Sequence, residues 1–319
     1  MRFCKLAEVS AILAMPLGFV NRGPMSAAEN AAPSRSRLPA RLVLLVGVLA
    51  TSASAILVRY AQEDAPSLVI AAGRLSASTL LLLPWASRRV AELQRLPPAG
   101  WKLALLSGLM LGLHFAGYIS SLRYTSIAAA TVLATSTPIW VGLAAPLLLG
   151  ESLTPALVPG LALALGGGAL IALQGGAAGS HLLGNALALS SALTGAVYLL
   201  IGRNLRPRLS LVAYTSVVYG TAALTLLMLV GLAGFSLAGY PPRVYLLFLL
   251  MALFPQLLGH SSYNYALAYL PAAYVSIAVI GEPVGASLLG WLLFREAPGL
   301  LTVLGGALIM VGILVASRN

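Results

Sequence analysis

Charged residues are scarce in this chain of 319 residues, because Asp, Glu, Lys and Arg together make up only 8% of it. A soluble domain carries about 25% charged residues, so the composition excludes a protein with a conventional aqueous surface. Hydrophobic residues make up 59%, and the mean hydropathy is +0.93. We therefore expect an integral membrane protein with almost no aqueous domain.

Cysteine is also nearly absent, since Cys4 is the only one, and this excludes an intrachain disulfide. Motifs of soluble enzymes are missing as well. No Gly-x-x-x-x-Gly-Lys phosphate loop occurs, so an ATP-driven pump would need another subunit. His114, His181 and His260 lack the close His-Glu-x-x-His spacing of a zinc site. We expect no cofactor and no metal.

The net charge of +11 would suggest a nucleic-acid partner if the protein were soluble. Here the basic residues lie in short loops and a tail, without a basic face or an aromatic platform for bases, so we expect no nucleic acid. One enzyme hypothesis stays open, an intramembrane hydrolase built on His114, His260 and Glu282. No activated serine or second acid accompanies them, so we expect that the protein is not an enzyme.

The apolar segments predict an all-α fold that crosses the membrane. A hydrocarbon core about 30 Å thick needs about 20 apolar residues per helix, and turn residues such as Pro97-Pro98 and Pro241-Pro242 separate the segments. We expect ten transmembrane helices over 41–58, 67–86, 102–121, 127–149, 154–173, 182–202, 210–232, 244–268, 271–293 and 299–317.

The placement of Lys and Arg predicts the orientation. Most of them lie in the N-terminal tail and in the loops around residues 87–102 and 203–208, and positively charged loops stay cytoplasmic. Both termini are therefore expected in the cytoplasm, at the cytoplasmic (inner) membrane. Residues 1–40 are expected to form a disordered cytoplasmic tail. A signal peptide is the alternative, although Lys5 and Glu8 interrupt its apolar run, and Met25 is an alternative start.

A stretch of the chain occurs twice. Residues 122–173 and 267–318 align without a gap at an offset of 145. The matched pairs include Tyr124 with Tyr269, Pro138 with Pro283, Glu151 with Glu296, Gly160 with Gly305 and Gly167 with Gly312. The repeat predicts two lobes, 41–173 and 182–318. Each lobe holds five spans, an odd number, so the two are expected to lie in the membrane as inverted repeats that enclose a binding site.

This order of motifs resembles the EamA type of the drug/metabolite transporter superfamily. It comprises Tyr-Thr before the fourth span, a mid-span proline, a terminal glutamate and a glycine-rich helix, with Arg74 in the second span. The resemblance implies a ten-helix secondary transporter, commonly an exporter of amino acids or other small metabolites. The chain departs from the pattern in one respect, because the seventh span has no arginine matching Arg74 and carries Ser216 near that level.

Polar side chains in the eighth span are the strongest candidates for a cavity lining. Gln256, His260, Tyr263 and Asn264 are spaced i, i+4, i+7 and i+8, which places them on one helix face. In lipid they must either bond to one another across a helix interface or line a cavity, and we favour the cavity.

Other spans supply further candidates. His114 and Tyr118 share a face of the third span, and Tyr118 is the repeat partner of Tyr263. Tyr198 follows Ser190 and Thr194 on one stripe of the sixth span, although Ser and Thr often bond back to their own helix. Trp140 is expected to pack rather than bind. The predicted substrate contacts are therefore His114, Tyr118, Tyr198, Gln256, His260, Tyr263 and Asn264.

Glu282 is the only acidic residue within a predicted span. It is either a coupling proton site or a structural group that bonds to the local backbone beside Pro283. Pro138 and Pro283 are expected to kink their spans at matching depths and to act as gating points. Arg74 is expected to pair with Glu282, to meet an anionic group, or to extend toward the outer interface, which we favour.

These patterns together predict a secondary transporter that works by alternating access around a central cavity between the lobes. Its expected partners are a small-molecule substrate and membrane lipid, and the fused lobes favour a monomer. An uncoupled facilitator or exchanger is the alternative within transport. A non-transporting membrane protein is the alternative outside it, and the short loops and the polar stripe of the eighth span argue against that.

Overall fold

The computed structural model describes residues 39–125, 127–151, 154–174, 182–294 and 299–316, and in these ranges the regular structure is entirely helical. Six helices are long and apolar enough to cross a membrane: Ala40–Ala61, Ser67–Gln94, Pro98–Tyr124, Leu182–Leu205, Leu211–Leu232 and Pro242–Ala266. Shorter apolar helices, Thr137–Leu149, Leu157–Leu170, Ala272–Ala286 and Val303–Ala316, lie within the other four predicted spans. The all-α membrane fold is confirmed, whereas the number of ten spans stays a prediction.

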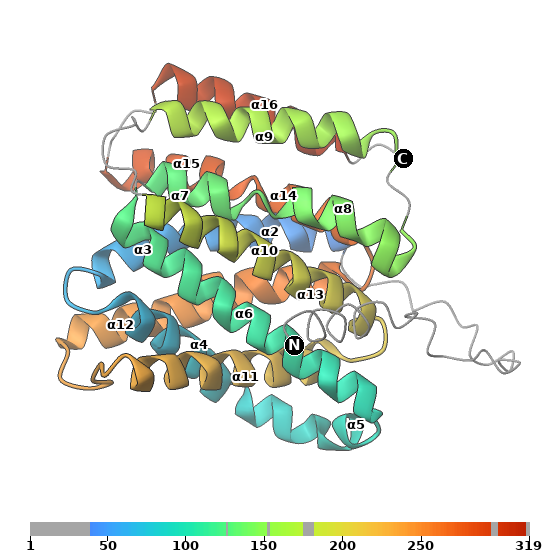
Figure 1. Cartoon of the computed structure of the whole chain (residues 1–319), viewed down its shortest axis with the longest axis vertical. Coiled ribbons are helices and arrows are strands. Elements are labelled where there is room, and N and C mark those ends of the chain that lie inside the picture. The colour runs from blue at the N-terminus through green and yellow to red at the C-terminus, as the bar shows by residue number, and fades with distance from the viewer. Residues whose placement is uncertain (1–38, 126, 152–153, 175–181, 295–298, 317–319) are drawn as a thin grey trace, which may run out of the picture.

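The helices follow the order of the two lobes (Figure 1). The first lobe contains α2 (Ala40–Ser52), α3 (Ser54–Ala61), α4 (Ser67–Ala86), η1 (Ser87–Arg89), α5 (Val90–Gln94), α6 (Pro98–Tyr124), α7 (Ile127–Ala134), α8 (Thr137–Leu149) and α9 (Leu157–Gln174). The second contains α10 (Leu182–Leu205), α11 (Leu211–Leu232), α12 (Pro242–Met251), the π-helix η2 (Ala252–His260), α13 (Ser261–Ala266), α14 (Ala272–Val279), α15 (Glu282–Phe294) and α16 (Leu300–Ala316).

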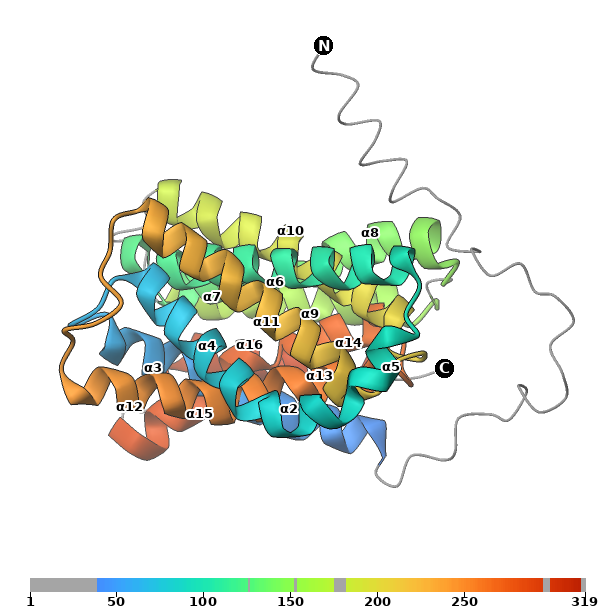
Figure 2. The same ribbon diagram turned by 90° about the horizontal axis from the view of Figure 1, so that it is seen from below.

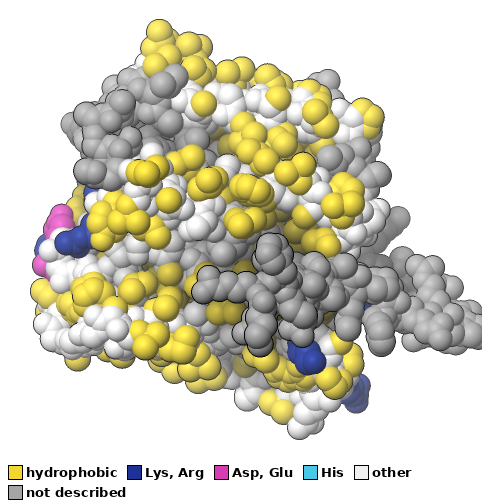
Figure 3. All heavy atoms as spheres, viewed as in Figure 1, with side chains coloured by type: hydrophobic (Ala, Val, Ile, Leu, Met, Phe, Trp, Pro, Cys, Tyr) yellow, Lys and Arg dark blue, Asp and Glu magenta, His cyan; other side chains and the backbone are white. Residues whose placement is uncertain are grey.

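The two lobes are interleaved rather than set side by side. α4 of the first lobe packs against α11 of the second (Figure 2), and α6 packs against both α10 and α11. On the other side of the core, α2 packs against η2, α13 and α15. Hydrophobic side chains cover much of the face seen in Figure 3. The exposed hydrophobic residues of the protein include Leu147, Leu182 and Leu232. Such a surface suits a lipid environment.

Two helices are interrupted at equivalent places. α7 ends at Ala134 and α8 begins at Thr137, while α14 ends at Val279 and α15 begins at Glu282. The second residue of each new helix is a proline, Pro138 or Pro283. The sequence predicted kinks at these positions, and in the structure the α-helix is interrupted there for two residues. Proline supplies no backbone N–H and crowds the preceding turn, and it is well suited to the first turn of a new helix.

The glycines of α9 and α16 lie where these two helices cross, at the top of Figure 1. A Cβ added to Gly160 would lie 2.7 Å from the carbonyl oxygen of Gly312, and one added to Gly167 would meet the carbonyl of Gly305. The pairing runs antiparallel, and it is reciprocal, because Gly305 and Gly312 are the repeat partners of Gly160 and Gly167. Reciprocal contacts of this kind arise around a two-fold axis, and small residues allow the close approach.

Candidate functional site

A cavity of about 60 Å³ lies at the centre of the bundle, between the lobes. The first lobe contributes α2, α3, α4, α6, α7 and α8, and the second contributes α10, η2, α13, α14 and α15. The lining residues are Thr51, Ser54, Arg74, His114, Phe115, Tyr118, Thr131, Ala134, Thr135, Thr137, Gly195, Tyr198, Leu199, His260, Tyr263, Val279 and Glu282. Both helix breaks border this cavity, through Thr135 and Thr137 at one and Val279 and Glu282 at the other.

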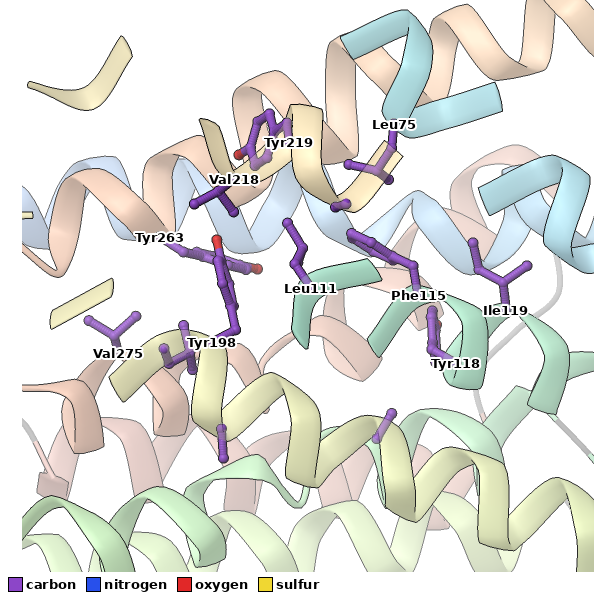
Figure 4. Close-up of a cluster of buried hydrophobic side chains, with 14 of the residues drawn as sticks. Leu75, Leu111, Phe115, Tyr118, Ile119, Tyr198, Val218, Tyr219, Tyr263 and Val275 are labelled. Carbon is purple, nitrogen blue, oxygen red and sulfur yellow. The ribbon is translucent and has the colours of Figure 1, made fainter. Parts of the chain in front are cut away.

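Aromatic rings form much of the cavity wall. His114 stacks on Tyr118 with ring centroids 6.3 Å apart, and His260 meets Phe115 edge-on at 5.0 Å. His260 also lies 5.4 Å from the ring of Tyr263. Figure 4 shows Tyr118, Tyr198 and Tyr263 coming from three different helices. The structure therefore brings together five of the predicted contacts, His114, Tyr118, Tyr198, His260 and Tyr263.

Gln256 and Asn264 are not among the lining residues, although the sequence predicts both as contacts. Each is fully buried against neighbouring helices. Gln256 Oε1 accepts a hydrogen bond from Arg74 Nε at 2.9 Å, and Asn264 Nδ2 donates to the Tyr219 hydroxyl at 3.5 Å. The stripe of the eighth span thus divides, since His260 and Tyr263 face the cavity while Gln256 and Asn264 bond to other helices.

Arg74 lies in the protein interior, and the favoured prediction that it extends to the outer interface is wrong. Its side chain is 1% exposed. The guanidinium donates from Nη1 to Ser54 Oγ at 2.9 Å as well as to Gln256, and it lies 4.2 Å from the centroid of the Phe115 ring. Hydrogen bonds and a ring face offset part of the cost of burying the charge. Arg74 therefore presents a positive charge to the cavity.

Glu282 presents a carboxylate to the same cavity. Tyr263 donates its hydroxyl proton to Glu282 Oε1 at 2.9 Å, and the Tyr263 oxygen lies 2.5 Å from Thr51 Oγ1. Because the tyrosine proton is used on Glu282, Thr51 is the donor in the second bond. The result is a chain of hydroxyls, from α2 through α13, that ends on the carboxylate of α15 and orients it.

Some polar residues of the predicted spans face away from the site. Ser190 and Thr194 bond to backbone carbonyls of their own helix, those of Leu187 and Ser190, so only Tyr198 of that stripe reaches the cavity. Trp140 lines a separate apolar groove of about 350 Å³ between α6, α8 and α10. Most of the other residues that line this groove are leucines and alanines.

The sequence did not point to Phe115, Thr51 or Ser54 as site residues. Phe115 looks like an ordinary core residue in an apolar helix, and its place beneath Arg74 depends on helix packing. Thr51 and Ser54 are small hydroxyl residues in an apolar span, where such residues usually bond to their own backbone. Thr51 Oγ1 also lies 3.1 Å and 3.0 Å from the carbonyl oxygens of Gly47 and Val48, which compete with Tyr263 for its single proton. The second role of Thr51, as the hydrogen-bond partner of Tyr263, follows only from the position of Tyr263 in the structure.

Ion pairs join the lobes at two places outside the cavity. Arg203 Nε lies 2.5 Å from Glu151 Oε1, and Arg243 Nε lies 2.5 Å from Asp64 Oδ2. Arg243 donates to Asp64 and thereby holds the pKa of that exposed carboxyl below its usual value. Glu296, the repeat partner of Glu151, lies outside the described residues, as do His181 and the tail of residues 1–38.

No metal-binding set of three His, Cys, Asp or Glu side chains occurs in the part of the chain that the structure describes. The cavity instead offers one cation, one carboxylate, hydroxyls and rings. These groups are suited to holding a small polar solute by charge, hydrogen bonds and ring contacts. The fold and the site together define an integral membrane protein of two interleaved helical repeats with a polar cavity between them.

The family model of the EamA-like transporter family matches residues 38–173 and 182–318, and the chain belongs to this family. The two matches coincide with the predicted lobes. A crystal structure described only as "Crystal structure of protein" is similar to this fold, with a TM-score of 0.71 and 22% sequence identity over 87% of this chain and 96% of that one. A search of the curated proteins found no match.

Proposed function

We propose that the protein is a secondary transporter that exports small metabolites such as amino acids. The observation that carries this proposal is the central cavity, which both repeats line and which holds Arg74, Glu282 and a ring of aromatic side chains. A buried charge in a membrane helix is costly and marks a solute or ion pathway. Membership of a transporter family supports the same reading.

The proposed mechanism is alternating access around this fixed site. The breaks beside Pro138 and Pro283 would serve as gating points, because half-helices joined by an interruption can tilt separately. The proposal includes ten spans in two inverted repeats, both termini in the cytoplasm, and a monomer in the inner membrane. The antiparallel crossing of α9 and α16 supports the inversion. Cysteines placed beside Glu151 and Glu296 should then react with a membrane-impermeant reagent from opposite sides, and reaction from one side would contradict it.

Glu282 is the proposed coupling group. A carboxylate that lines the cavity is positioned to exchange a proton when the cavity opens to water, and its bond from Tyr263 fixes its position. The structural alternative, a bond to local backbone beside Pro283, has less support, because the carboxylate accepts its bond from a different helix. An uncoupled facilitator would use the same cavity without a proton step.

The test is flux into proteoliposomes of a panel of amino acids, purine derivatives and quaternary amines, with and without a pH gradient. Wild type should show saturable flux that the gradient concentrates, and Glu282→Gln should retain flux but lose the concentration. The matched control is Glu63→Gln, which removes a carboxylate that is 54% exposed and lies outside the cavity lining, and which should behave as wild type. Saturable flux that neither the pH gradient nor Glu282→Gln changes would indicate an uncoupled facilitator. The absence of flux for every solute would overturn transport.

A further inference from the structure

The apolar groove that contains Trp140 is larger than the central cavity, with a volume of about 350 Å³ against about 60 Å³. Its walls come from α6, α8 and α10. Two of its leucines, Leu143 and Leu147, are 65% and 85% exposed. Around a bundle that spans a membrane, such side chains meet hydrocarbon rather than water. The groove therefore takes its occupant from the membrane.

The dimensions of the groove fit one hydrocarbon chain. Along α10 it extends from Leu193 to Asn204, which is about 16 Å at a rise of about 1.5 Å per residue. A helix about 10 Å wide would fill about 1,200 Å³ over that length, so the groove is too small to take in a helix of a second copy. An apolar cavity of about 150 Å³ binds benzene, and on that scale the groove accommodates on the order of 14 carbon atoms.

The polar end of the groove is formed where three helices begin or end. Asn204 lines the groove in the last turn of α10, and Leu149 lines it at the end of α8. Leu103 lines it near the start of α6, directly after Lys102. Trp140 lies about 13 Å deeper along α8. The groove thus runs from a polar mouth at one membrane surface into the apolar interior.

The side chains at this mouth are available to a phosphate group. Lys102 is exposed and Asn204 is half-buried, and neither side chain bonds to another residue in the ranges that the structure describes. Arg203, next to Asn204, is neutralised by Glu151, so Lys102 carries the uncompensated positive charge. Basic pockets between transmembrane helices bind the head groups of anionic lipids, and an amide N–H can donate to a phosphate oxygen.

We propose that this groove binds one acyl chain of an anionic phospholipid, with the lipid phosphate at Lys102 and Asn204. The site is separate from the proposed transport site and does not depend on it. The two sites share a wall, because α8 places Thr137 in the central cavity and Trp140 in the groove less than one turn later. A bound lipid would therefore contact the half-helix that follows the first break.

The test uses the full-length protein with Trp140 as the only tryptophan, the other three being replaced by phenylalanine. Phosphatidylcholine vesicles contain a small, equal fraction of either phosphatidylglycerol or phosphatidylcholine with brominated chains, because bromine quenches tryptophan fluorescence on contact. The phosphatidylglycerol should quench Trp140 with about fivefold higher affinity, which is the contribution of one basic residue at a membrane surface. Equal quenching by the two lipids would overturn the inference. Quenching by neither would show that protein covers the groove, and would overturn it as well.

Variants at the mouth test the head-group contact. Lys102→Gln should bring the ratio of the two lipid affinities close to one, while Lys102→Arg should preserve it. The matched control is Arg88→Gln, which removes an exposed arginine of η1, in the connection that leads to α6, and should leave the ratio unchanged. Each ratio is measured within one protein and does not depend on how much protein folds. A wild-type ratio in Lys102→Gln, or an equal fall in Arg88→Gln, would overturn the assignment.

A further variant tests the groove itself. Ala144 lines the groove, so the larger side chain of Ala144→Leu would occupy part of its volume and should remove most of the quenching of Trp140 by phosphatidylglycerol. The matched control is Ala162→Leu, the same change at an exposed alanine of α9, which should quench as wild type. Unchanged quenching in Ala144→Leu would overturn the insertion of the acyl chain.

Discussion

The carboxylate of Glu151 is held by Arg203, whose Nε lies 2.5 Å from Oε1, so the C-terminal end of α8 in the first repeat is ion-paired with the second repeat. The other carboxylate oxygen accepts from the backbone N–H of Ala272 at 3.2 Å, and Arg203 Nη1 donates to the carbonyl of Leu267 at 3.0 Å. Gly150 adopts φ of 65° and ends α8 directly before Glu151. One ion pair thereby ties the ends of α8, α10 and α13 to the start of α14.

We predict that Arg203→Gln favours opening of the bundle at this end. The pair is partly buried, with side-chain exposures of 25% and 18%, so its loss should shift the balance between closed and open forms by about 1 kcal/mol, which is about fivefold. The measurement is the labelling rate of a cysteine introduced at Thr137 by a membrane-impermeant reagent. Arg208→Gln, which removes an exposed arginine from the turn that follows α10, is the control. An unchanged labelling rate in Arg203→Gln would contradict a closing role.

We predict a pH-dependent contribution from Asp64. Its pKa lies below the ordinary value of 3.8, because Arg243 donates to it. Folding therefore favours the charged carboxyl. The stabilisation is fully present above the ordinary pKa and is lost as the pH falls through the lowered value. Wild type and Asp64→Asn should differ in thermal unfolding at about pH 6, and the difference should shrink as the pH falls below the ordinary pKa of 3.8. The effect is small, because the pair is exposed, and a difference that persists in acid would argue for another cause.

We predict that Gly167→Ala destabilises the protein. Its Cβ would collide with the backbone carbonyl of Gly305, so α9 and α16 must move apart, at a cost of about 1–3 kcal/mol. Gly166 is the matched control, because an added Cβ there has no neighbour within 4 Å, and Gly166→Ala should be neutral or slightly stabilising. Thermal unfolding of the two variants in detergent measures the difference. Equal unfolding temperatures would mean that the helices do not depend on this contact.

We predict that Tyr263→Phe impairs function with little loss of stability. The ring stays in place, but Thr51 loses its link to Glu282 and the carboxylate loses its oriented donor. The Thr51 proton can then be donated to the carbonyl of Gly47 or Val48 instead. Loss of a hydrogen bond to a charged group is worth about 1.5–3 kcal/mol, so substrate affinity should fall by at least about tenfold. Tyr245→Phe, at an exposed tyrosine, should not change affinity. An equal effect of both substitutions would refute a specific role for Tyr263.

Much of the architecture could be predicted from the sequence. Apolar length and breaker residues locate spans, and the repeat at an offset of 145 located the two lobes and the equivalent positions of Pro138 and Pro283. The sequence predicted a kink at each proline, and it did not predict that the α-helix is interrupted there for two residues, because a mid-span proline alone is compatible with a continuous bent helix. Whether the helix stops depends on what the neighbouring helices supply to the freed backbone groups, and sequence spacing does not contain that information.

The site was predictable in part. Helical spacing placed His260 and Tyr263 on one face correctly, and the repeat pointed from Tyr263 to Tyr118. Spacing alone did not separate these residues from Gln256 and Asn264, because a buried polar stripe satisfies its hydrogen bonds either in a cavity or against another helix. Gln256 is directed away from the cavity because its Oε1 accepts a hydrogen bond from Arg74. Arg74 is buried, whereas the sequence favoured an arginine that extends to the outer interface. The position of a residue along one span does not reveal which neighbouring helices surround its side chain.

The reciprocal glycine contacts of α9 and α16 show that this single chain has the two-fold pseudo-symmetry of a homodimer. A pair of identical subunits would have to duplicate every residue of its shared cavity, so that a cation or a carboxylate would always appear twice. Here Glu282 has Thr137 as its repeat partner, and both line the cavity. In one fused chain the two halves can differ, and the cavity is lined by one arginine and one glutamate at positions that the repeat does not relate to each other.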